Sequence, residues 1–449
     1  MTGPGPSPVP AGRGPARPLR SRAAAAATRH VNRLSRRLGR GHGTVIGGRA
    51  GLALDPRLVA RLAAGRPVAL VSGTNGKTTT TRLLAVAVAS AGADVVTNDT
   101  GSNMPAGLAA ALATGPRLGP VVLEVDEGYL PGQVETLRPT AVVLLNLSRD
   151  QLDRTNEVRM LAGRWRSTLA VAGLSTVVAN ADDPLVVWGA GRAPRVRWVA
   201  AGLNWRADAV GCPACEGRIR FDAQPATGSA APGRWSGRWS GGWSCPCGFA
   251  RPEPEVWLED GIGGSTEVVG IDGRRHRVDL ALPGRFNQAN AAMAATAAQV
   301  LGADVDRALV AMAGVESVAG RFTVAPVAGV PTRLLLAKNP AGWSELLDLV
   351  SPGTGPVVVG INARVADGKD PSWLWDVAFE QLQDRPVVAT GDRCLDLSVR
   401  LHYAEVAHQT VPDPVAAVLR AGRDRTGDRP VDYIGNYTAF HDLLGRVGR

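Results

Sequence analysis

The chain has 449 residues, of which 45% are hydrophobic and 20% charged, which is enough apolar sequence for about two or three domains. No apolar run approaches the roughly 18 residues of a membrane-spanning helix, and five cysteines are too few for a disulfide scaffold in a chain of this length. We therefore expect a soluble cytoplasmic protein rather than an integral membrane or disulfide-rich secreted one.

The net charge of +10 is concentrated near the N-terminus, because residues 1–43 contain nine Arg and no Asp, Glu or Lys. Residues 1–18 are rich in Pro and Gly and are expected to be disordered, whereas residues 19–38 are expected to form a helix. The arginines of this helix either form a solvated face on a helix packed against the body or contact anionic lipid headgroups. The rest of the chain is nearly neutral, so we expect no binding of nucleic acid.

Apolar strands and helices alternate from residue 67 onward. Residues 67–72 read as a buried strand and residues 78–91 as the helix that follows it. Further strands are expected at residues 94–97, 121–125 and 141–147. This alternation predicts an α/β fold with a doubly wound, mostly parallel sheet.

A break rich in Cys, Trp, Gly and Arg interrupts this pattern at about residues 203–255, and a second α/β pattern begins near residue 326. The elements expected beyond the break are helices at 287–301, 343–350 and 437–447 and strands at 333–337, 356–361 and 386–390. We accordingly divide the chain into a basic arm and helix (1–43), a central domain (44–318) containing an insert (203–255), and a C-terminal α/β domain (319–449).

The segment Val71-Ser-Gly-Thr-Asn-Gly-Lys-Thr-Thr79 has the composition and context of a phosphate loop, between a strand and a helix. Glycines allow backbone N–H groups to converge on phosphate oxygens, and the helix N-terminus favours negative charge. We expect Lys77 to reach the β- and γ-phosphates of ATP and the Thr78 hydroxyl to bind Mg²⁺. The other expected nucleotide-binding residues of the loop are Gly73, Thr74, Asn75, Gly76 and Thr79.

Only three of the 50 basic residues are lysines, namely Lys77, Lys338 and Lys369. Where Arg replaces Lys almost everywhere, a remaining Lys is expected at a place that requires an ammonium group. Lys338 is therefore predicted to contact a phosphate or the substrate.

Glu124 ends a hydrophobic strand that should lie in the same sheet as the phosphate loop, so we expect it to hold Mg²⁺. Asp126 and Glu127 are alternatives for this role.

Cys212, Cys215, Cys245 and Cys247 form a C-x₂-C-x₂₉-C-x-C pattern. Two close pairs with flanking Pro and Gly predict four thiolates around a structural Zn²⁺ with no open position; the alternative is a set of reduced, unliganded thiols. Cys394 stands alone and is expected to be a buried or incidental thiol.

Several of these motifs resemble those of a known protein family. The phosphate loop, Asn146-Leu-Ser-Arg-Asp-Gln-Leu-Asp-Arg154, Asn180-Ala-Asp-Asp-Pro184 and Gly284-Arg-Phe-Asn-Gln-Ala-Asn290 resemble the Mur ligases, which join an amine to a peptidoglycan-precursor carboxylate using ATP. Residues 97–104, the four cysteines and the segments 337–342 and 366–375 more narrowly resemble the MurT-type subunits of lipid II isoglutaminyl synthase. The resemblance covers about residues 20–445.

The resemblance implies that ATP phosphorylates the α-carboxylate of D-glutamate in the lipid II stem peptide. Ammonia from a partner glutaminase of the GatD type would then displace phosphate to give D-isoglutamine. It also implies that Asn287, Asn290 and Arg321 lie near the nucleotide. Asp370, or alternatively Asp367, would complete the Cys-His pair of the glutaminase. A lipid-linked substrate would place the protein at the inner face of the plasma membrane.

Two departures from the Mur ligase pattern bear on this expectation. Gln151 stands where most of these enzymes have His, and no Lys lies where most carry a carbamylated Lys, so a second Mg²⁺ is left open. About 66 residues precede the phosphate-loop strand, so no UDP-binding domain is expected, in keeping with a lipid-linked substrate.

Two other functions share some of these features. One is a stand-alone ligase similar to folylpolyglutamate synthase or another Mur-type amino-acid ligase. The other is a nucleic-acid-binding NTPase that uses a zinc ribbon and a basic arm.

Overall fold

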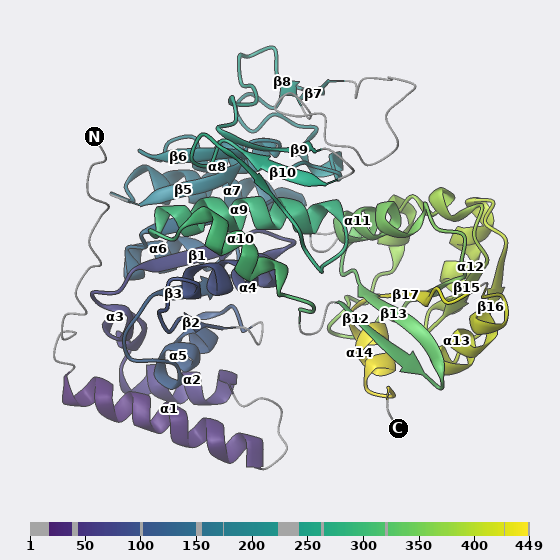
Figure 1. The fold of residues 1–449 in the computed structure, drawn as a ribbon, viewed down its shortest axis with the longest axis horizontal. Coiled ribbons are helices and arrows are strands. Elements are labelled where there is room, and N and C mark those ends of the chain that lie inside the picture. The colour runs from purple at the N-terminus through teal and green to yellow at the C-terminus, as the bar shows by residue number, and fades with distance from the viewer. Residues whose placement is uncertain are drawn as a thin grey trace.

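The computed structural model describes residues 18–37, 44–98, 102–149, 155–173, 175–222, 242–261, 265–318, 322–425 and 427–447. Two α/β bodies of unequal size lie side by side, the larger one N-terminal (Figure 1). Gln151 and Arg321 lie outside the described residues. None of the described helices combines the length and hydropathy that crossing a bilayer requires.

Three helices precede the first strand: α1 (Leu19–Arg37), α2 (Thr44–Leu54) and α3 (Leu58–Ala63). The helix predicted at residues 19–38 corresponds to α1, which ends one residue earlier. Helix α1 packs on α2, α3 and α5 through small buried side chains such as Ala24 and Ala25. The helix that precedes residue 43 is thus attached to the central body rather than separate from it.

A nine-stranded sheet forms the larger body, in the order β11-β10-β9-β6-β5-β4-β1-β3-β2. Strands β1 to β6 and β9 are parallel, and β10 and β11 extend the sheet as an antiparallel edge. The strands are β1 (Val68–Ser72), β2 (Val96–Thr97), β3 (Val121–Glu124), β4 (Ala141–Leu144), β5 (Thr176–Asn180), β6 (Val196–Ala200), β9 (Val256–Asp260), β10 (Thr266–Val269) and β11 (Arg275–Arg277).

Helices cover both faces of this sheet, which explains why β1 is buried along its whole length and reads as a continuous apolar run. One core lies under α4, α9 and α10, and the other under α1, α3 and α5 to α8. Their bounds are α4 (Lys77–Ala89), α5 (Pro105–Thr114), α6 (Leu130–Leu137), α7 (Thr155–Ala170), α8 (Pro184–Ala190), α9 (Arg285–Val300) and α10 (Val305–Ala313).

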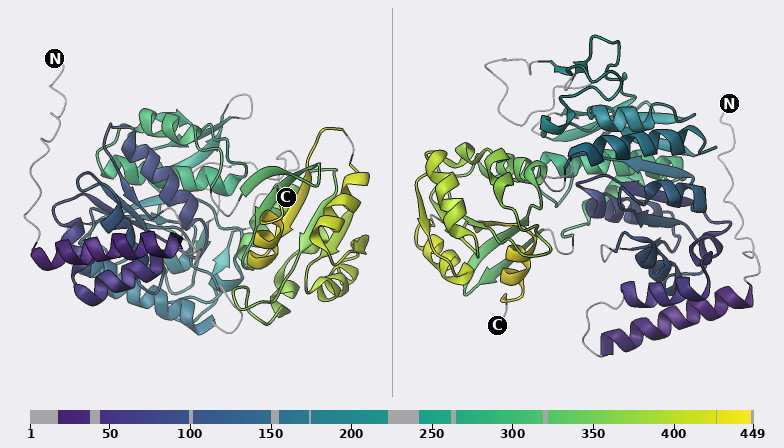
Figure 2. Two further views of the ribbon diagram at one scale, coloured as in Figure 1. Left: turned by 90° about the horizontal axis from the view of Figure 1, so that it is seen from below. Right: turned by 180° about the vertical axis from the view of Figure 1, so that it is seen from behind.

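The cysteine insert leaves the sheet after β6 and returns at β9. It contains η2 (Ala207–Ala209) and the antiparallel pair β7 (Arg220–Phe221) and β8 (Trp243–Ser244). Trp243 is buried and donates a hydrogen bond from Nε1 to the Ala181 carbonyl, 3.1 Å away. The insert and α1 lie at opposite ends of the large sheet (Figure 2).

The C-terminal body has a six-stranded sheet in the order β12-β13-β17-β14-β15-β16, parallel except for β12. The strands are β12 (Phe322–Val327), β13 (Val330–Leu336), β14 (Val357–Gly360), β15 (Val387–Thr390), β16 (His408–Thr410) and β17 (Val431–Gly435). The helices are α11 (Pro340–Val350), η5 (Ser372–Asp376), η6 (Phe379–Leu382), α12 (Cys394–Tyr403), α13 (Pro414–Arg423) and α14 (Tyr437–Leu444).

Two sequence-based expectations for the strands were wrong in detail. The strand expected at 94–97 is reduced to β2, because it lies at the sheet edge and pairs only with β3. The strand expected at 333–337 begins earlier and is preceded by β12, with which it forms a hairpin. Ala328 and Gly329, with φ of 47° and 83°, make its tight turn, and an Ala-Gly pair is a weak signal for such a turn.

Candidate functional site

The phosphate loop leaves β1 and enters α4 through two glycines with left-handed backbone. Gly73 has φ of 142° and Gly76 has φ of 83°. A Cβ atom on Gly73 would lie 2.9 Å from the Cβ of Leu145, and one on Gly76 would lie 2.8 Å from Oδ1 of Asn290. Any other residue at either position would combine a strained backbone with a Cβ atom in close contact, so glycine is required at both.

The end of β4 holds the loop in shape. The Asn75 backbone N–H donates to Oδ1 of Asn146 (2.8 Å), and Nδ2 of Asn146 donates to the Asn75 carbonyl (3.1 Å). Thr74 donates from its backbone N–H to the Asn146 carbonyl and from Oγ1 to the Ser148 carbonyl. Asn146 was not predicted as a site residue, because its clamping role depends on the adjacency of β4 and β1 in the folded sheet.

Lys77 is buried in the loop, with 7% of its surface exposed. Its Nζ donates to the carbonyls of Gly73 and Thr74 and lies 3.2 Å from Oε1 of Glu127. Burial raises the pKa of Glu127, although the charge of Lys77 opposes this shift. The ammonium group therefore sits beside the loop amides, where an anion would be attracted by both.

Glu124 is the carboxylate that best fits a cation. It ends β3, next to β1, and is only 2% exposed. Its Oε1 accepts a hydrogen bond from Nδ2 of Asn103 (3.1 Å), but its Oε2 has no partner among the described residues. A buried oxygen left without a partner is costly, and a bound cation would remove that cost.

The two alternative carboxylates are engaged elsewhere. Glu127 pairs with Lys77, and Asp126 accepts a hydrogen bond from the Gly128 backbone N–H within its own turn. Thr78, in the first turn of α4, is 8% exposed. Glu124 and Thr78 are therefore the residues that fit a Mg²⁺ at this edge of the sheet, where a hydroxyl and a carboxylate supply hard oxygen ligands.

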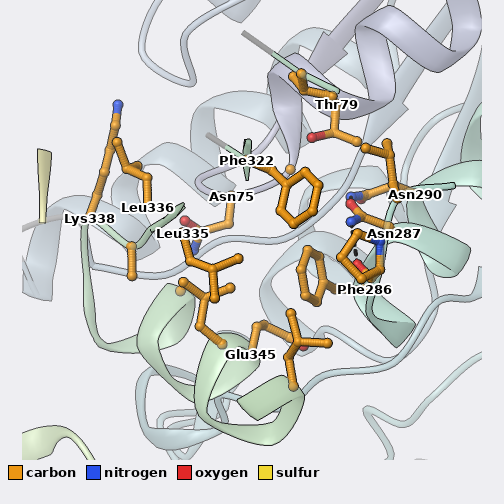
Figure 3. A pocket seen from close by; sticks show the side chains of 18 of the residues that line it. Asn75, Thr79, Phe286, Asn287, Asn290, Phe322, Leu335, Leu336, Lys338 and Glu345 are labelled. Carbon is orange, nitrogen blue, oxygen red and sulfur yellow. Dashed lines mark hydrogen bonds between the residues drawn. The ribbon is translucent and has the colours of Figure 1, made fainter. Parts of the chain in front are cut away.

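A cavity of about 130 Å³ lies between the phosphate loop, the start of α9 and the C-terminal body. Figure 3 shows Phe286 and Phe322 projecting into it beside Asn287 and Asn290. Asn287 donates from Nδ2 to the Pro283 carbonyl (2.6 Å), which fixes its orientation. Flat aromatic walls with a few fixed amides suit a planar, polar-edged ring such as a nucleotide base.

The C-terminal body closes this cavity and touches the phosphate loop directly. Nδ2 of Asn75 donates to Oδ1 of Asn339 (3.2 Å), and the same Oδ1 accepts from the Gly342 backbone N–H at the start of α11. Lys338 is exposed and lies over the ring of Tyr437, 5.4 Å from its centre. Figure 3 shows Lys338 extending away from the cavity.

A second contact between the two bodies joins Asn204 to α11. Nδ2 of Asn204 donates to Oε2 of Glu345 and to Oδ2 of Asp348, both at 2.9 Å. Burial, and next the charge of Asp348, raises the pKa of Glu345 to about 8, while Arg285 acts in the opposite direction. The site thus contains a carboxyl group that holds a proton near neutral pH.

Asp367 and Asp370 have different surroundings. Asp367 accepts hydrogen bonds from the backbone N–H of Thr438 (2.8 Å) and from its hydroxyl, so both of its oxygens are used within the domain. Asp370 is exposed and accepts a hydrogen bond from the Ser372 backbone N–H (2.9 Å). This bond and a second one from the Ser372 side chain lower the pKa of Asp370. Asp370 is therefore an ionised carboxylate at the surface, whereas Asp367 stabilises the start of α14.

Asn436 does not line the cavity. It is 2% exposed, accepts from the Asn362 backbone N–H (3.0 Å) and donates to the Asn362 carbonyl (2.6 Å). Its role is to tie the ends of β17 and β14 together.

The sulfur atoms of Cys212, Cys215, Cys245 and Cys247 lie within 4.8 Å of one another. The Cys212–Cys247 and Cys215–Cys245 sulfur pairs are 3.8 and 3.5 Å apart. A tetrahedral site with Zn–S bonds of about 2.3 Å needs sulfurs about 3.8 Å apart, so the four thiols fit Zn²⁺. Cys394 is buried at the start of α12 and belongs to no metal-ligating cluster of the described residues.

The structure therefore gathers Lys77, Thr78, Glu124, Asn287 and Asn290 around one loop. Asp370 and the four cysteines are not among the residues that line the cavity.

Comparison with known proteins matches both bodies. Residues 71–209 match the Mur ligase middle domain, and residues 336–440 match the MurT ligase C-terminal domain. The subunit MurT of lipid II isoglutaminyl synthase (glutamine-hydrolyzing) from Staphylococcus aureus (strain COL) is 26% identical over 447 residues, which cover 94% of this chain and 97% of the relative. The corresponding subunit of Streptococcus pneumoniae (strain ATCC BAA-255 / R6) is 27% identical over 381 residues, covering 80% and 82%.

Solved structures show the same fold. A pseudomurein peptide ligase type C from Methanothermus fervidus aligns with a TM-score of 0.61 at 20% identity, over 87% of this chain and 81% of that one. MurF from Acinetobacter baumannii aligns with a TM-score of 0.61 at 14% identity, over 88% and 80%.

Proposed function

Because this chain belongs to the MurT-type Mur ligases, we propose that it is the amidating subunit of a lipid II isoglutaminyl synthase. It converts the α-carboxylate of D-glutamate in the lipid II stem peptide to the amide of D-isoglutamine, using ATP and ammonia from a GatD-type glutaminase. The observation that carries this proposal is the similarity to named MurT subunits along 94% of the chain, which includes the phosphate loop and the C-terminal domain.

In the first step, a carboxylate oxygen of the substrate attacks the γ-phosphorus of ATP, and the bond between that phosphorus and ADP breaks. The product is an acyl phosphate. Lys77 and the amides at the start of α4 stabilise the charge on the transferring group, and most of the catalysis in such a reaction is electrostatic. When ATP binds, Nζ of Lys77 gives up its hydrogen bonds to the Gly73 and Thr74 carbonyls and donates to phosphate oxygens instead.

Thr78 and Glu124 are the residues that hold Mg²⁺, which supplies charge neutralisation at the phosphates. The unpartnered Oε2 of Glu124 supports this assignment. Asn103 keeps the carboxylate oriented by donating to its other oxygen.

In the second step, the nitrogen of ammonia attacks the acyl carbon. The bond from this carbon to the phosphate oxygen breaks, phosphate leaves, and the nitrogen loses a proton. A carboxylate is a poor electrophile, so the preceding phosphorylation supplies the leaving group that this step needs.

Asp370 serves the partner subunit rather than the ligase reaction. An aspartate beside a Cys-His pair orients the imidazole and stabilises it when it is protonated. The exposure of Asp370 and its lowered pKa support this role, because the group is ionised and reachable from outside the chain. The engaged oxygens of Asp367 argue against that alternative.

The four cysteines hold a structural Zn²⁺. Four protein thiolates would fill the coordination positions of the ion and leave none open for a substrate. The described residues of the insert form a small apolar core with Val187, which includes Ile219 and Trp243, so we expect the insert to depend on the metal for its stability.

The test is to co-purify the chain with a candidate glutaminase and to incubate the complex with lipid II, ATP and glutamine. We expect the mass of lipid II to change by the replacement of one hydroxyl by an amino group, and fragmentation to place the amide on D-glutamate. Ammonium salts should replace glutamine and the partner, and omission of ATP should stop the reaction. ATP-dependent addition of an amino acid without any glutaminase would instead identify a stand-alone ligase.

A further inference from the structure

Helix α1 presents one face that consists of basic and small residues. This face contains four arginines, namely Arg22, Arg29, Arg33 and Arg37. The first two are about two helical turns apart, with Ala26 between them, and each of the others follows after about one turn. This spacing places them along one side of the helix. The opposite side is the one that packs on the protein, through Ser21, Ala24, Ala25, Thr28, Asn32 and Ser35.

No acidic side chain neutralises this face from within the helix, since residues 19–37 contain neither Asp nor Glu. Arg29 donates from Nη1 to the Ala113 carbonyl and so anchors α1 to α5. In the part of the chain that the structure describes, the side chains of Arg22, Arg33 and Arg37 have neither an ion pair nor a hydrogen bond. Their charge is therefore available to a partner outside the chain.

Exposed apolar side chains flank the basic face. Leu19 and Leu34, near the two ends of α1, are 79% and 51% exposed, and Val45 and Ile46 at the start of α2 are 43% and 52% exposed. Basic residues interleaved with exposed aliphatic ones are typical of helices that lie in a lipid–water interface.

The same helices lie close to the catalytic carboxylate. Helix α2 touches the first turn of α5 backbone to backbone, since a Cβ atom on Gly48 would lie 1.8 Å from the Ala106 carbonyl oxygen. Asn103, just before α5, donates to Glu124. A partner surface in contact with α1 would thus lie one layer of helices away from the segment before α5 that orients Glu124 (Figures 1 and 2).

We propose that α1, together with the start of α2, is the surface by which this protein adsorbs to a bilayer rich in anionic phospholipid. This rests on the proposed function in one respect: a lipid-borne substrate must be reached at a membrane surface. Each basic residue near such a surface strengthens adsorption about fivefold. A straight helix of 19 residues, about 28 Å long, matches a flat sheet of headgroups.

The composition of this surface favours lipid over nucleic acid. Residues 19–54 contain no Phe, Tyr or Trp on which a base could stack, and the amide residue of α1, Asn32, is buried. Proteins that bind single-stranded nucleic acid depend on aromatic stacking, which this surface does not supply, and the bidentate reading of adenine needs an exposed amide, which α1 lacks.

The test is co-sedimentation of the full chain with vesicles of phosphatidylcholine containing phosphatidylglycerol. We expect binding that requires the anionic lipid and is lost in high salt. The variant Arg22→Gln/Arg33→Gln/Arg37→Gln should bind at least about tenfold more weakly. The matched control Arg307→Gln/Arg423→Gln/Arg429→Gln removes the same charge from exposed sites elsewhere and should bind as the unaltered protein does.

Equal binding of the two triple variants would overturn the proposal, as would binding that does not depend on phosphatidylglycerol. The proposal would also be overturned if a nucleic acid displaced the protein from vesicles at a phosphate concentration far below the phosphate concentration of the lipid. Amidation of a short-chain, water-soluble lipid II analogue separates the two proposals. The α1 variant should retain that activity and lose rate only on lipid II embedded in vesicles. An unaltered protein that binds vesicles but amidates neither substrate would refute the proposed function alone.

Discussion

Lys77 occupies a position that an arginine could not fill in the same way. Its ammonium group fits among two loop carbonyls and the carboxylate of Glu127, in a space that leaves little of it exposed. A guanidinium is larger and planar, and it does not fit a compact, three-coordinated position. This accounts for a lysine in a chain that otherwise uses arginine.

Lys77→Ala is therefore expected to lower ammonia-driven amidation at least about 100-fold, as loss of a group that stabilises transition-state charge does. The fold should survive, because Glu127 has a raised pKa and can take up a proton when its partner is removed. Amidation measured with ammonium salts, together with co-purification of the partner subunit, checks both parts. Arg82→Ala, at an exposed position of the same helix, is the control and should keep full activity.

Asp370→Asn should abolish glutamine hydrolysis by the complex and leave amidation with free ammonia unchanged, because the residue is exposed and does not line the cavity beside the phosphate loop. The comparison variant is Asp367→Asn, which weakens the hydrogen bonds to Thr438 and should cost about 1 kcal/mol of stability. Glutaminase assays and thermal unfolding of both variants separate these effects. If Asp370→Asn hydrolyses glutamine normally, the assignment of this residue to the partner's site is wrong.

At the scale of elements, the ends of three neighbouring strands supply the phosphate loop and the residues beside it. Strand β1 delivers the loop, β3 delivers Glu124, and β4 delivers Asn146, which clamps Asn75 from the side. Parallel strands place their carboxyl ends at one edge of the sheet, so residues far apart in the sequence meet there. The cysteine insert is a separate element on the same domain, attached through Trp243 and through the buried pair of Arg251 with Asp182.

We expect one zinc ion per chain in the unaltered protein and none in Cys245→Ser. Zinc in such sites contributes roughly 10–16 kcal/mol of binding free energy that is also folding free energy, so its loss should unfold the insert locally. Metal analysis and limited proteolysis of residues 203–255 measure the two effects. Cys394→Ala removes the buried thiol outside the cluster and should retain the zinc; identical metal content in both variants would contradict the assignment.

At the scale of the whole molecule, polar contacts join the C-terminal body to the larger body near the phosphate loop. They include the hydrogen bond of Asn75 to Asn339, the contact of Asn204 with Glu345 and Asp348, and the ion pair of Arg149 with Asp376. Asn75 and Glu345, which take part in these contacts, also line the cavity between the bodies. The protonation of Glu345 therefore bears on how the bodies fit together.

The contact at Glu345 makes stability depend on pH. The pKa of this group is raised from 4.5 to about 8 in the folded protein, mainly by burial, so the fold holds its proton more tightly than the unfolded chain does. The resulting stabilisation is complete below about pH 4.5 and is lost as the pH rises toward and through 8. We expect the unfolding temperature to fall between pH 6 and pH 9, and Glu345→Gln to reduce that fall.

The matched control for this experiment is Glu135→Gln, which alters an exposed carboxyl on α6. Its pH profile should follow that of the unaltered protein. A Glu345→Gln variant with the same pH profile as the unaltered protein would show that the interface between the bodies does not titrate in this range.

The sequence by itself determined those features that depend on neighbours along the chain. The phosphate loop, the buried strands before and after it, and the paired cysteines are set by local spacing and by apolar runs, and the structure contains them close to where they were predicted. Short spacing brings the two cysteines of each pair together, whereas the fold of the insert brings the two pairs together. The fold class followed from the alternation of strands and helices.

Only the tertiary structure decided between chemically equivalent residues. Glu124, Asp126 and Glu127 are all carboxylates within four positions of one another, and what separates them is burial and the partners that β1 and α4 bring. Asp367 and Asp370 are separated in the same way by Thr438, which lies 71 positions along the chain from Asp367. Such choices depend on contacts between distant segments, and the free energy of those contacts comes from burial and pairing that exist only once the chain has folded.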